Sequence, residues 1–217
     1  MPDSSPYHLG ELELLSDLSN PLRAVPSYDS RGWTILDIGC GMGQTLTAVE
    51  FGHCSARHGI DVDAKAIALG RQRFPEFTLS VAGAEQIPYP DNTFDLTFSR
   101  VALPYTDVPV ALREMFRVTK PGGRVWLTLH DWSMERVQIK NALRDRNPRR
   151  LADRCYVLVN SMVLALFGVC LRRPGSGTVE SIQSERGIRR LLRKAGFADI
   201  ELTHAVHFLV AGVKPRI

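Results

Sequence analysis

A short apolar segment that ends in closely spaced glycines constrains the fold of this chain more than any other feature. Residues 33–38 are rich in apolar and β-branched residues, and Gly39, Gly41 and Gly43 follow them. Such an apolar run is typical of a buried parallel strand. Glycines directly after a strand let a ligand approach the backbone closely, because no Cβ stands in the way. The segment therefore predicts a strand, a ligand-binding loop and then a helix at 44–51, and a purely structural turn is the alternative.

The strand-then-helix order continues along the chain and predicts a parallel sheet. Further strands are predicted at 58–61, 77–81, 94–99 and 124–130, and further helices at 64–73, 108–118 and 187–195. Repeated strand–helix units with right-handed crossovers place helices on both faces of one sheet. With two final strands from the β-rich tail at 200–213, we expect an α/β fold of the Rossmann-like, doubly wound type. Its sheet should have seven strands and be mostly parallel.

Two aspartates at the ends of predicted strands decide which ligand suits the loop. Asp37 directly precedes the glycines, and Asp61 ends the second strand, where a carboxylate can accept hydrogen bonds from ribose hydroxyls. A dinucleotide site needs a third glycine where this chain has Gln44, and Asp37 would repel a pyrophosphate. S-adenosylmethionine (SAM) instead carries an ammonium and a sulfonium, which Asp37 would attract. The sequence thus favours SAM over NAD, and an NAD-dependent reductase is the least favoured of our hypotheses.

Four stretches of the sequence together resemble the small class I SAM-dependent methyltransferases of the ubiquinone-biosynthesis type. They are LDIGCGMG at 36–43, GIDVD at 59–63, AEQIPYPDNTFD at 84–95, and LRE at 112–114 with KPGGR at 120–124. The resemblance covers residues 33–128 and resumes weakly from residue 185. It implies an enzyme that transfers a methyl group from SAM and releases S-adenosylhomocysteine.

The resemblance also assigns cofactor-binding roles to residues that follow the predicted strands. Residues of the glycine loop would line the methionine moiety, an acid would hold the ribose, and a backbone N–H would meet the adenine ring. The implied set is Asp37, Gly39, Cys40, Gly41 and Gly43 in the loop, Asp61 at the ribose, Val62 and Ala84 at the adenine, and Ser99 and Arg100 beside the sulfonium and the substrate.

One position departs from the pattern of this family. The family usually has an acid immediately before the alanine, where it bonds the adenine amino group, but this chain has Gly83 there. Glu85, two residues further on, is predicted to bind the cofactor in its place. The alternative is that backbone groups or water meet the amino group.

Methyl transfer from a sulfonium mainly requires the protein to align the acceptor and exclude water. A general base helps where the acceptor is a hydroxyl or an ammonium. The candidate catalytic residues are Tyr105 after the fourth strand, His130 and Asp131 after the fifth, and His8 in the N-terminal segment; packing roles are the alternative for Tyr105 and His130. No Asn-Pro-Pro-Tyr motif of base-methylating enzymes is present, so we expect a small-molecule acceptor. A catalytically inactive protein that binds SAM or S-adenosylhomocysteine, as a partner or sensor, is the alternative function.

Residues 132–178 interrupt the regular order and are predicted to form a helical insertion after the fifth strand, within a single domain that spans residues 1–217. The insertion contains the apolar run 156–171, which favours an apolar acceptor. Ligands of open α/β sheets bind beyond the carboxyl ends of the strands, where this insertion leaves the sheet. We therefore expect the insertion, with an N-terminal lid segment at 1–30, to roof the acceptor pocket. Leu164 and Phe167 are predicted to face that pocket.

Composition narrows the location and the partners. The net charge of +4 comes without a long basic run, so we do not expect nucleic acid as a partner, and the arginines between 144 and 154 are predicted to be solvated. The four cysteines lack zinc-ligand spacing, so no metal is expected. The run 156–171 is shorter than the ~20 residues of a transmembrane helix, although contact with a membrane surface stays open. Without a signal-peptide pattern, we expect a cytoplasmic monomer or homodimer.

Overall fold

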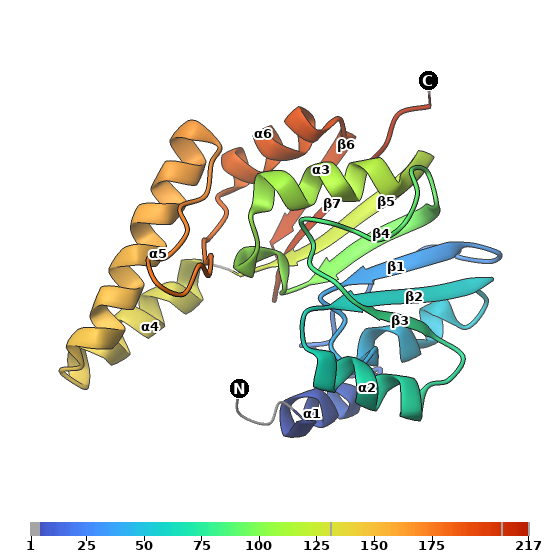
Figure 1. The fold of residues 1–217 in the computed structure, drawn as a ribbon, viewed down its shortest axis with the longest axis horizontal. Coiled ribbons are helices and arrows are strands. Elements are labelled where there is room, and N and C mark those ends of the chain that lie inside the picture. The colour runs from blue at the N-terminus through green and yellow to red at the C-terminus, as the bar shows by residue number, and fades with distance from the viewer. Residues whose placement is uncertain (1–4, 131, 205, 217) are drawn as a thin grey trace.

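A computed structural model describes residues 5–130, 132–204 and 206–216. In this part of the chain seven strands form one sheet, in the order β3-β2-β1-β4-β5-β7-β6 (Figure 1). The first five strands are parallel, whereas β7 is antiparallel to both β5 and β6. The strands are β1 (Thr34–Ile38), β2 (Ala56–Asp61), β3 (Thr78–Val81), β4 (Phe94–Arg100), β5 (Thr119–Leu129), β6 (Ala198–His204) and β7 (Phe208–Val213). The predicted mostly parallel, seven-stranded sheet is confirmed.

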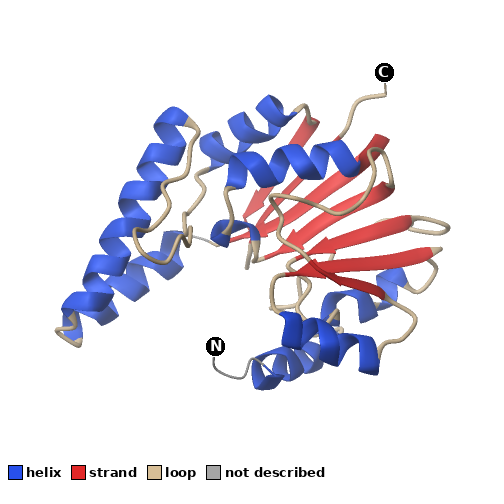
Figure 2. Cartoon of the chain, viewed as in Figure 1, coloured by secondary structure: helices blue, strands red, loops and turns tan. Residues whose placement is uncertain are grey.

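Helices cover both faces of the sheet (Figure 2). The α-helices are α1 (Ser5–Ser16), α2 (Ala64–Arg73), α3 (Val108–Val118), α4 (Trp132–Arg144), α5 (Pro148–Phe167) and α6 (Glu185–Ala195). Short 3-10 helices are η1 (Gln44–Thr47), η2 (Val49–Phe51) and η3 (Leu103–Tyr105). Helices α3 and α6 lie on one face, and α2 lies on the other with η1 and η2 (Figure 1).

The alternation of side chains along each strand explains these two layers. In β5, Val125 and Leu127 belong to the apolar core beneath α3 and α6, whereas Trp126 belongs to the core on the opposite face. Successive side chains of a strand point to opposite faces, so an apolar run such as the one in β5 needs a cover on both sides. The buried strands therefore require the helical layers that the sequence supplies between them.

The segment after the glycine loop differs from the single helix that the sequence predicted at 44–51. The structure has the two 3-10 helices η1 and η2, and Ala48 between them has φ −59° and ψ 141°, far from helical values. Thr45, Thr47 and Val49 are β-branched, and such residues lose side-chain freedom in an α-helix. The loop is therefore followed by two short, tight turns and not by a regular α-helix.

Helices α4 and α5 form a hairpin beside the sheet, at the edge where the parallel strands end (Figure 1). Helix α5 begins at Pro148, eight residues before the apolar run, with Asn147 as its N-cap. It buries one side, with Val157, Ser161 and Leu164, against the rest of the protein. Among the described residues no helix is long and apolar enough to cross a membrane.

Candidate cofactor and acceptor site

The glycine loop adopts a backbone that side chains would obstruct. Gly39, Gly41 and Gly43 have φ values of 77°, 56° and 89°, in the left-handed region that favours glycine. A Cβ on Gly39 would lie 2.1 Å from the Cβ of Ala102, and a Cβ on Gly41 would lie 2.5 Å from the ring of His8. The loop is thus a narrow cradle between the end of β4 and helix α1.

Asp61, at the end of β2, holds this loop in place. One of its carboxylate oxygens accepts a hydrogen bond from the amide of Gly41 at 2.8 Å, and the other accepts one from the amide of Asp63, also at 2.8 Å. A carboxylate has about four acceptor positions, so each oxygen keeps one for a further donor. The predicted ribose acid therefore lies against the loop with free acceptor capacity.

Asp37, the last but one residue of β1, carries a carboxylate that the protein itself does not satisfy. The side chain is only 1% exposed, and neither oxygen has a hydrogen-bond partner among the described residues. Burial, and then the nearby charge of Asp61, raise the pKa of Asp37 well above its ordinary value, and the neighbouring Thr45 side chain opposes this shift only in part. An unpartnered buried carboxylate is costly, and native proteins retain such groups where a ligand or ion supplies the partner. The two carboxylate oxygens of Asp37 therefore suit a positively charged group such as the ammonium of SAM.

Beyond Asp61 lie the three residues that the sequence analysis assigns to the adenine, which are Val62, Ala84 and Glu85. Val62 is 73% exposed, and Ala84 is buried. A Cβ on Gly83 would lie 3.2 Å from a carboxylate oxygen of Glu85 and 3.8 Å from the side chain of Val62. The second Glu85 oxygen accepts a hydrogen bond from the amide of Asp107 at 2.8 Å. The Glu85 carboxylate therefore lies beside the position where the family's usual acid is missing.

The remaining residues implied for the cofactor occupy three different environments. Cys40 is buried, and burial raises the pKa of its thiol well above the ordinary value. Ser99 is buried in β4, and its hydroxyl has no partner among the described residues. Arg100 forms an ion pair with Glu11 of α1. This ion pair connects helix α1 to the end of β4.

His8 is placed on the cofactor side of the site. Its ring is buried against Gly41, and its Nδ1 lies 3.4 Å from the side-chain nitrogen Nε2 of Gln44. Helix α1 thus covers the glycine loop, in line with a lid role for the N-terminal segment. As a candidate base, His8 lies where the methionine moiety and not the acceptor is expected.

Tyr105 and His130, which follow β4 and β5, lie together in the structure. Their rings meet edge to face with centroids 5.5 Å apart. They line a small pocket of about 50 Å³ together with Glu135, Arg154 and Glu180. The Nε2 of His130 and the Oε1 of Glu135 are both buried without a hydrogen-bond partner among the described residues. The pocket therefore holds two free polar atoms.

An ion network that the sequence analysis missed forms one wall of this pocket. Arg154 of α5 donates to Glu135 of α4 at 3.1 Å and to the two oxygens of Glu180 at 3.1 and 3.3 Å. The expectation that the arginines up to 154 are solvated is wrong for Arg154. The signal was available, because an antiparallel hairpin that turns at 145–147 brings positions 135 and 154 side by side.

Burial sets the protonation of the groups in this pocket. It lowers the pKa of His130, an effect that the charge of Glu180 opposes, and it raises the pKa of Tyr105. Burial also raises the pKa of Glu135, although the nearby Arg154 opposes the shift. At neutral pH the imidazole is therefore neutral and free to accept a proton. Asp131, the neighbouring candidate, lies outside the described residues.

The chain between β4 and η3 separates the two halves of the site. Ala102 packs against Gly39 on one side, and Tyr105 lines the polar pocket on the other. Val101 has φ 63°, a genuine outlier for a β-branched residue, and its amide donates to the carbonyl of Thr128 at 3.0 Å. Backbone strain of this kind concentrates at functional sites. The strained residue lies in the segment that separates the glycine loop from the polar pocket.

Comparison with known proteins agrees with this geometry. Residues 36–127 match the family model described as a methyltransferase domain. The ubiquinone/menaquinone biosynthesis C-methyltransferase UbiE of Escherichia coli is 38% identical over 106 residues, which are 44% of this chain and 41% of that protein. The demethylmenaquinone methyltransferase of Symbiobacterium thermophilum is 34% identical over 99 residues, 42% of this chain and 39% of that protein. Residues 36–127 are therefore similar to the methyltransferase domain of the SAM-dependent methyltransferases. SAM is the methyl donor of this family, as the sequence predicted.

Solved structures show the same fold. The S-adenosylmethionine-dependent methyltransferase of Mesorhizobium loti has a TM-score of 0.58 and 19% identity, over 86% of this chain and 93% of that one. A SAM-dependent methyltransferase of Methanosarcina mazei has a TM-score of 0.56 and 20% identity, over 86% and 94%. The sequence matches to UbiE and its relatives, in contrast, span about two fifths of the length of those proteins. The match to the family model ends at residue 127, before the insertion.

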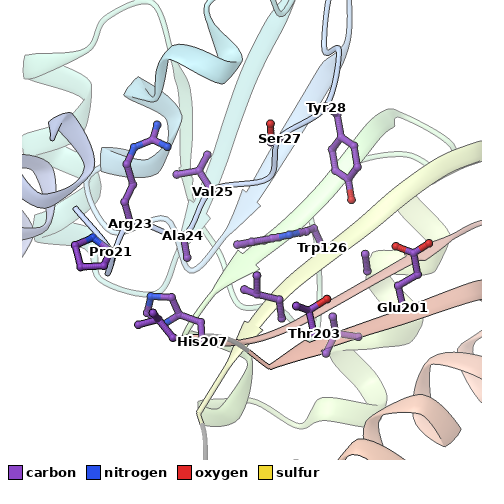
Figure 3. Close-up of a pocket in the computed structure, with 14 residues that line it drawn as sticks. Pro21, Arg23, Ala24, Val25, Ser27, Tyr28, Trp126, Glu201, Thr203 and His207 are labelled. Carbon is purple, nitrogen blue, oxygen red and sulfur yellow. The ribbon is translucent and has the colours of Figure 1, made fainter. Parts of the chain in front are cut away.

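A larger cavity of this methyltransferase domain lies away from the site. It has a volume of about 400 Å³ and lies on the sheet face opposite α3 and α6, where Trp126 and Thr203 meet the segment 21–28 (Figure 3). None of its lining residues belongs to the glycine loop or to the polar pocket. It is therefore separate from both the glycine loop and the polar pocket.

Proposed function

We propose that this protein transfers the methyl group of SAM to a small acceptor that binds at the carboxyl ends of β4 and β5. The observation that carries the proposal is the Asp37 carboxylate, which is buried and unpartnered beside the glycine loop. When bound there, SAM would supply a methyl group on a positively charged sulfur, which makes the methyl electrophilic. Asp37 would hold the ammonium, Asp61 the ribose hydroxyls, and Val62 with Glu85 the adenine.

The polar pocket is our proposed site for the reacting end of the acceptor. The segment between β4 and η3 separates Tyr105 and His130 from Gly39, and Ala102 packs on that glycine. The unpartnered Nε2 of His130 would accept a proton from an acceptor hydroxyl, and the Oε1 of Glu135 would accept a second hydrogen bond. A pocket of about 50 Å³ has room for a polar group of a few atoms, so the body of the acceptor would extend outside it.

We propose a hydroxylated, quinone-related ring as the acceptor class. Two relatives carry names that place them in ubiquinone and menaquinone biosynthesis, and a hydroxylated ring provides the donors that His130 and Glu135 lack. The apolar run 156–171 was expected to cover the acceptor pocket. In the structure, residues of α4 and of the first half of α5 line the polar pocket, and the apolar run does not. Leu164 is part of the core, and Phe167 is 71% exposed, so neither faces the pocket.

The test is a transfer assay with the full chain, labelled SAM and a panel of hydroxylated aromatic and quinol acceptors, read out by mass spectrometry of the product. The proposal expects a product that gains one methyl group, and loss of most of this activity in His130→Asn with SAM affinity retained. SAM binding without transfer to any acceptor, in the panel or in cell extract, would favour the catalytically inactive SAM-binding protein instead. A product of the same yield from His130→Asn would remove the assigned base.

A further inference from the structure

Helix α5 carries an uncharged, outward-facing stripe along its whole length. Its members recur every three or four residues, so they share one face of the helix. This outer stripe consists of Pro148, Ala152, Cys155, Val159, Met162 and Leu166, all of them exposed. Met162 is 57% exposed and Leu166 is 62% exposed, and Phe167 and Val169 extend the apolar surface beyond them.

The opposite face of α5 is already occupied, so the stripe is a second, separate surface. Val157 and Leu164 are buried, and Asn160 and Ser161 bond to the returning segment 171–182. No described residue covers the outer stripe. A helix that is apolar on both faces needs a neighbour on each side. One neighbour of α5 is therefore missing from the isolated chain.

The charge around the stripe identifies that neighbour. Residues 132–178 contain nine lysines and arginines but three aspartates and glutamates, a net charge of +6 against +4 for the whole chain. The rest of the protein is thus slightly acidic, and the positive charge is concentrated on the hairpin. Arg146 and Arg149 at the hairpin tip and Arg172 after α5 are exposed, so basic groups lie beyond both ends of the stripe.

A second copy of the chain fits this surface poorly, because pairing two stripes would bring two hairpins of charge +6 together. Nucleic acid would meet the arginines but would leave the apolar stripe exposed. An anionic lipid surface satisfies both features, since amphipathic helices insert apolar side chains at the headgroup boundary and flanking basic residues attract anionic lipid. We propose that the outer stripe and the arginines around it bind the protein reversibly to an anionic membrane surface.

The test is co-sedimentation of the full chain with vesicles of phosphatidylcholine alone or with roughly one third phosphatidylglycerol. We expect binding to the anionic vesicles, at least tenfold weaker binding to the neutral ones, and loss of binding at high salt, which screens the arginines. The double variant Met162→Glu/Leu166→Glu and the double variant Arg146→Glu/Arg149→Glu should each weaken binding at least tenfold. The matched control is Val49→Glu, an exposed apolar residue outside the hairpin, which should bind vesicles like wild type.

Calorimetric titration with SAM keeps this proposal separate from the proposed function, because all these variants should bind SAM like wild type. Absence of wild-type binding to anionic vesicles would overturn the membrane proposal, as would equal binding by either double variant. A dimer in sedimentation velocity that Met162→Glu/Leu166→Glu dissociates would assign the stripe to a second copy instead. Vesicle binding by a protein that transfers no methyl group would leave the membrane surface standing and contradict only the catalytic proposal.

Discussion

The carboxylate of Asp61 accepts a hydrogen bond from the amide of Gly41 at 2.8 Å, so the last residue of β2 fixes the loop that follows β1. The same carboxylate is the proposed acceptor for the ribose hydroxyls. Ribose binding and loop geometry are therefore coupled through one side chain. A substitution at Asp61 should affect both, and the two effects can be separated by the choice of replacement.

Replacement of Asp61 should weaken SAM binding in two steps. Asp61→Asn keeps an oxygen that can accept from the Gly41 amide but loses the charge, and Asp61→Ala loses both. Hydrogen bonds to a charged group contribute about 1.5–3 kcal/mol, so Asp61→Ala should bind SAM about ten- to a hundredfold more weakly, with Asp61→Asn in between. Calorimetry on variants whose circular dichroism matches wild type measures this order. Equal affinities for all three proteins would contradict the assignment.

Substitution of Gly41 should remove SAM binding even after its clash with His8 is relieved. A Cβ at Gly41 would lie 2.5 Å from the His8 ring, and the φ of 56° is unfavourable for any residue with a side chain. We expect Gly41→Ala to weaken SAM binding at least tenfold, and the double variant His8→Ala/Gly41→Ala to recover stability without recovering affinity. Thermal denaturation and calorimetry measure the two quantities. Full recovery of affinity in the double variant would show that the glycine serves only to accommodate His8.

Asp37 should make the protein without cofactor less stable as the pH rises. The folded-state pKa of Asp37 lies above the ordinary aspartate value. Between these two pKa values, the folded chain holds a proton that the unfolded chain has lost. The stability from this group is fully present below about pH 3.9 and is lost as the pH rises through the folded pKa. Asp37→Asn should flatten this slope and stabilise the cofactor-free protein at neutral pH by about 1–3 kcal/mol, while weakening SAM binding.

Denaturation at a series of pH values, with and without SAM, checks the Asp37 prediction. The exposed Asp199→Asn serves as the matched control and should follow wild type throughout. If Asp37→Asn bound SAM as tightly as wild type, the carboxylate would have no role at the ammonium.

His130 should set the acidic limb of the rate profile. Burial lowers its pKa, so the neutral form that accepts a proton persists below the ordinary histidine pKa of about 6.5. The turnover of wild type should therefore fall only below that pH, and His130→Asn should lose about 10²- to 10⁴-fold in kcat together with this limb. Tyr105→Phe keeps the ring contact and should lose less. An unchanged acidic limb in His130→Asn would exclude this imidazole as the base.

The sequence predicted the sheet because it depends on local patterns, and the assignment of cofactor-binding residues rests on patterns of the same kind. Apolar runs of strand length, glycines after β1 and acids at fixed distances reflect backbone requirements that hold wherever this fold occurs. Tyr105 and His130 meet in the structure because they follow neighbouring parallel strands, which end at one edge of the sheet. Contacts of this kind follow from topology alone.

The insertion was predicted less well because its structure depends on contacts between distant residues. Arg154 belongs to an arginine-rich stretch that resembles a solvated surface, and only its pairing with Glu135 and Glu180 reveals that it lines a pocket. Leu164 and Phe167 are three residues apart, yet one is in the core and the other is exposed. The sequence showed that the run 156–171 is apolar but did not show which of its residues the protein itself covers.

Calorimetric titration of the full chain with SAM, S-adenosylhomocysteine and NAD tests the central claim, that the loop between Asp37 and Asp61 binds SAM, most directly. The geometry predicts saturable binding of one SAM or one S-adenosylhomocysteine per chain and no binding of NAD. It also predicts that SAM binding weakens as the pH falls through the raised folded-state pKa of Asp37. Binding of NAD, or the absence of SAM binding to the folded protein, would contradict the account.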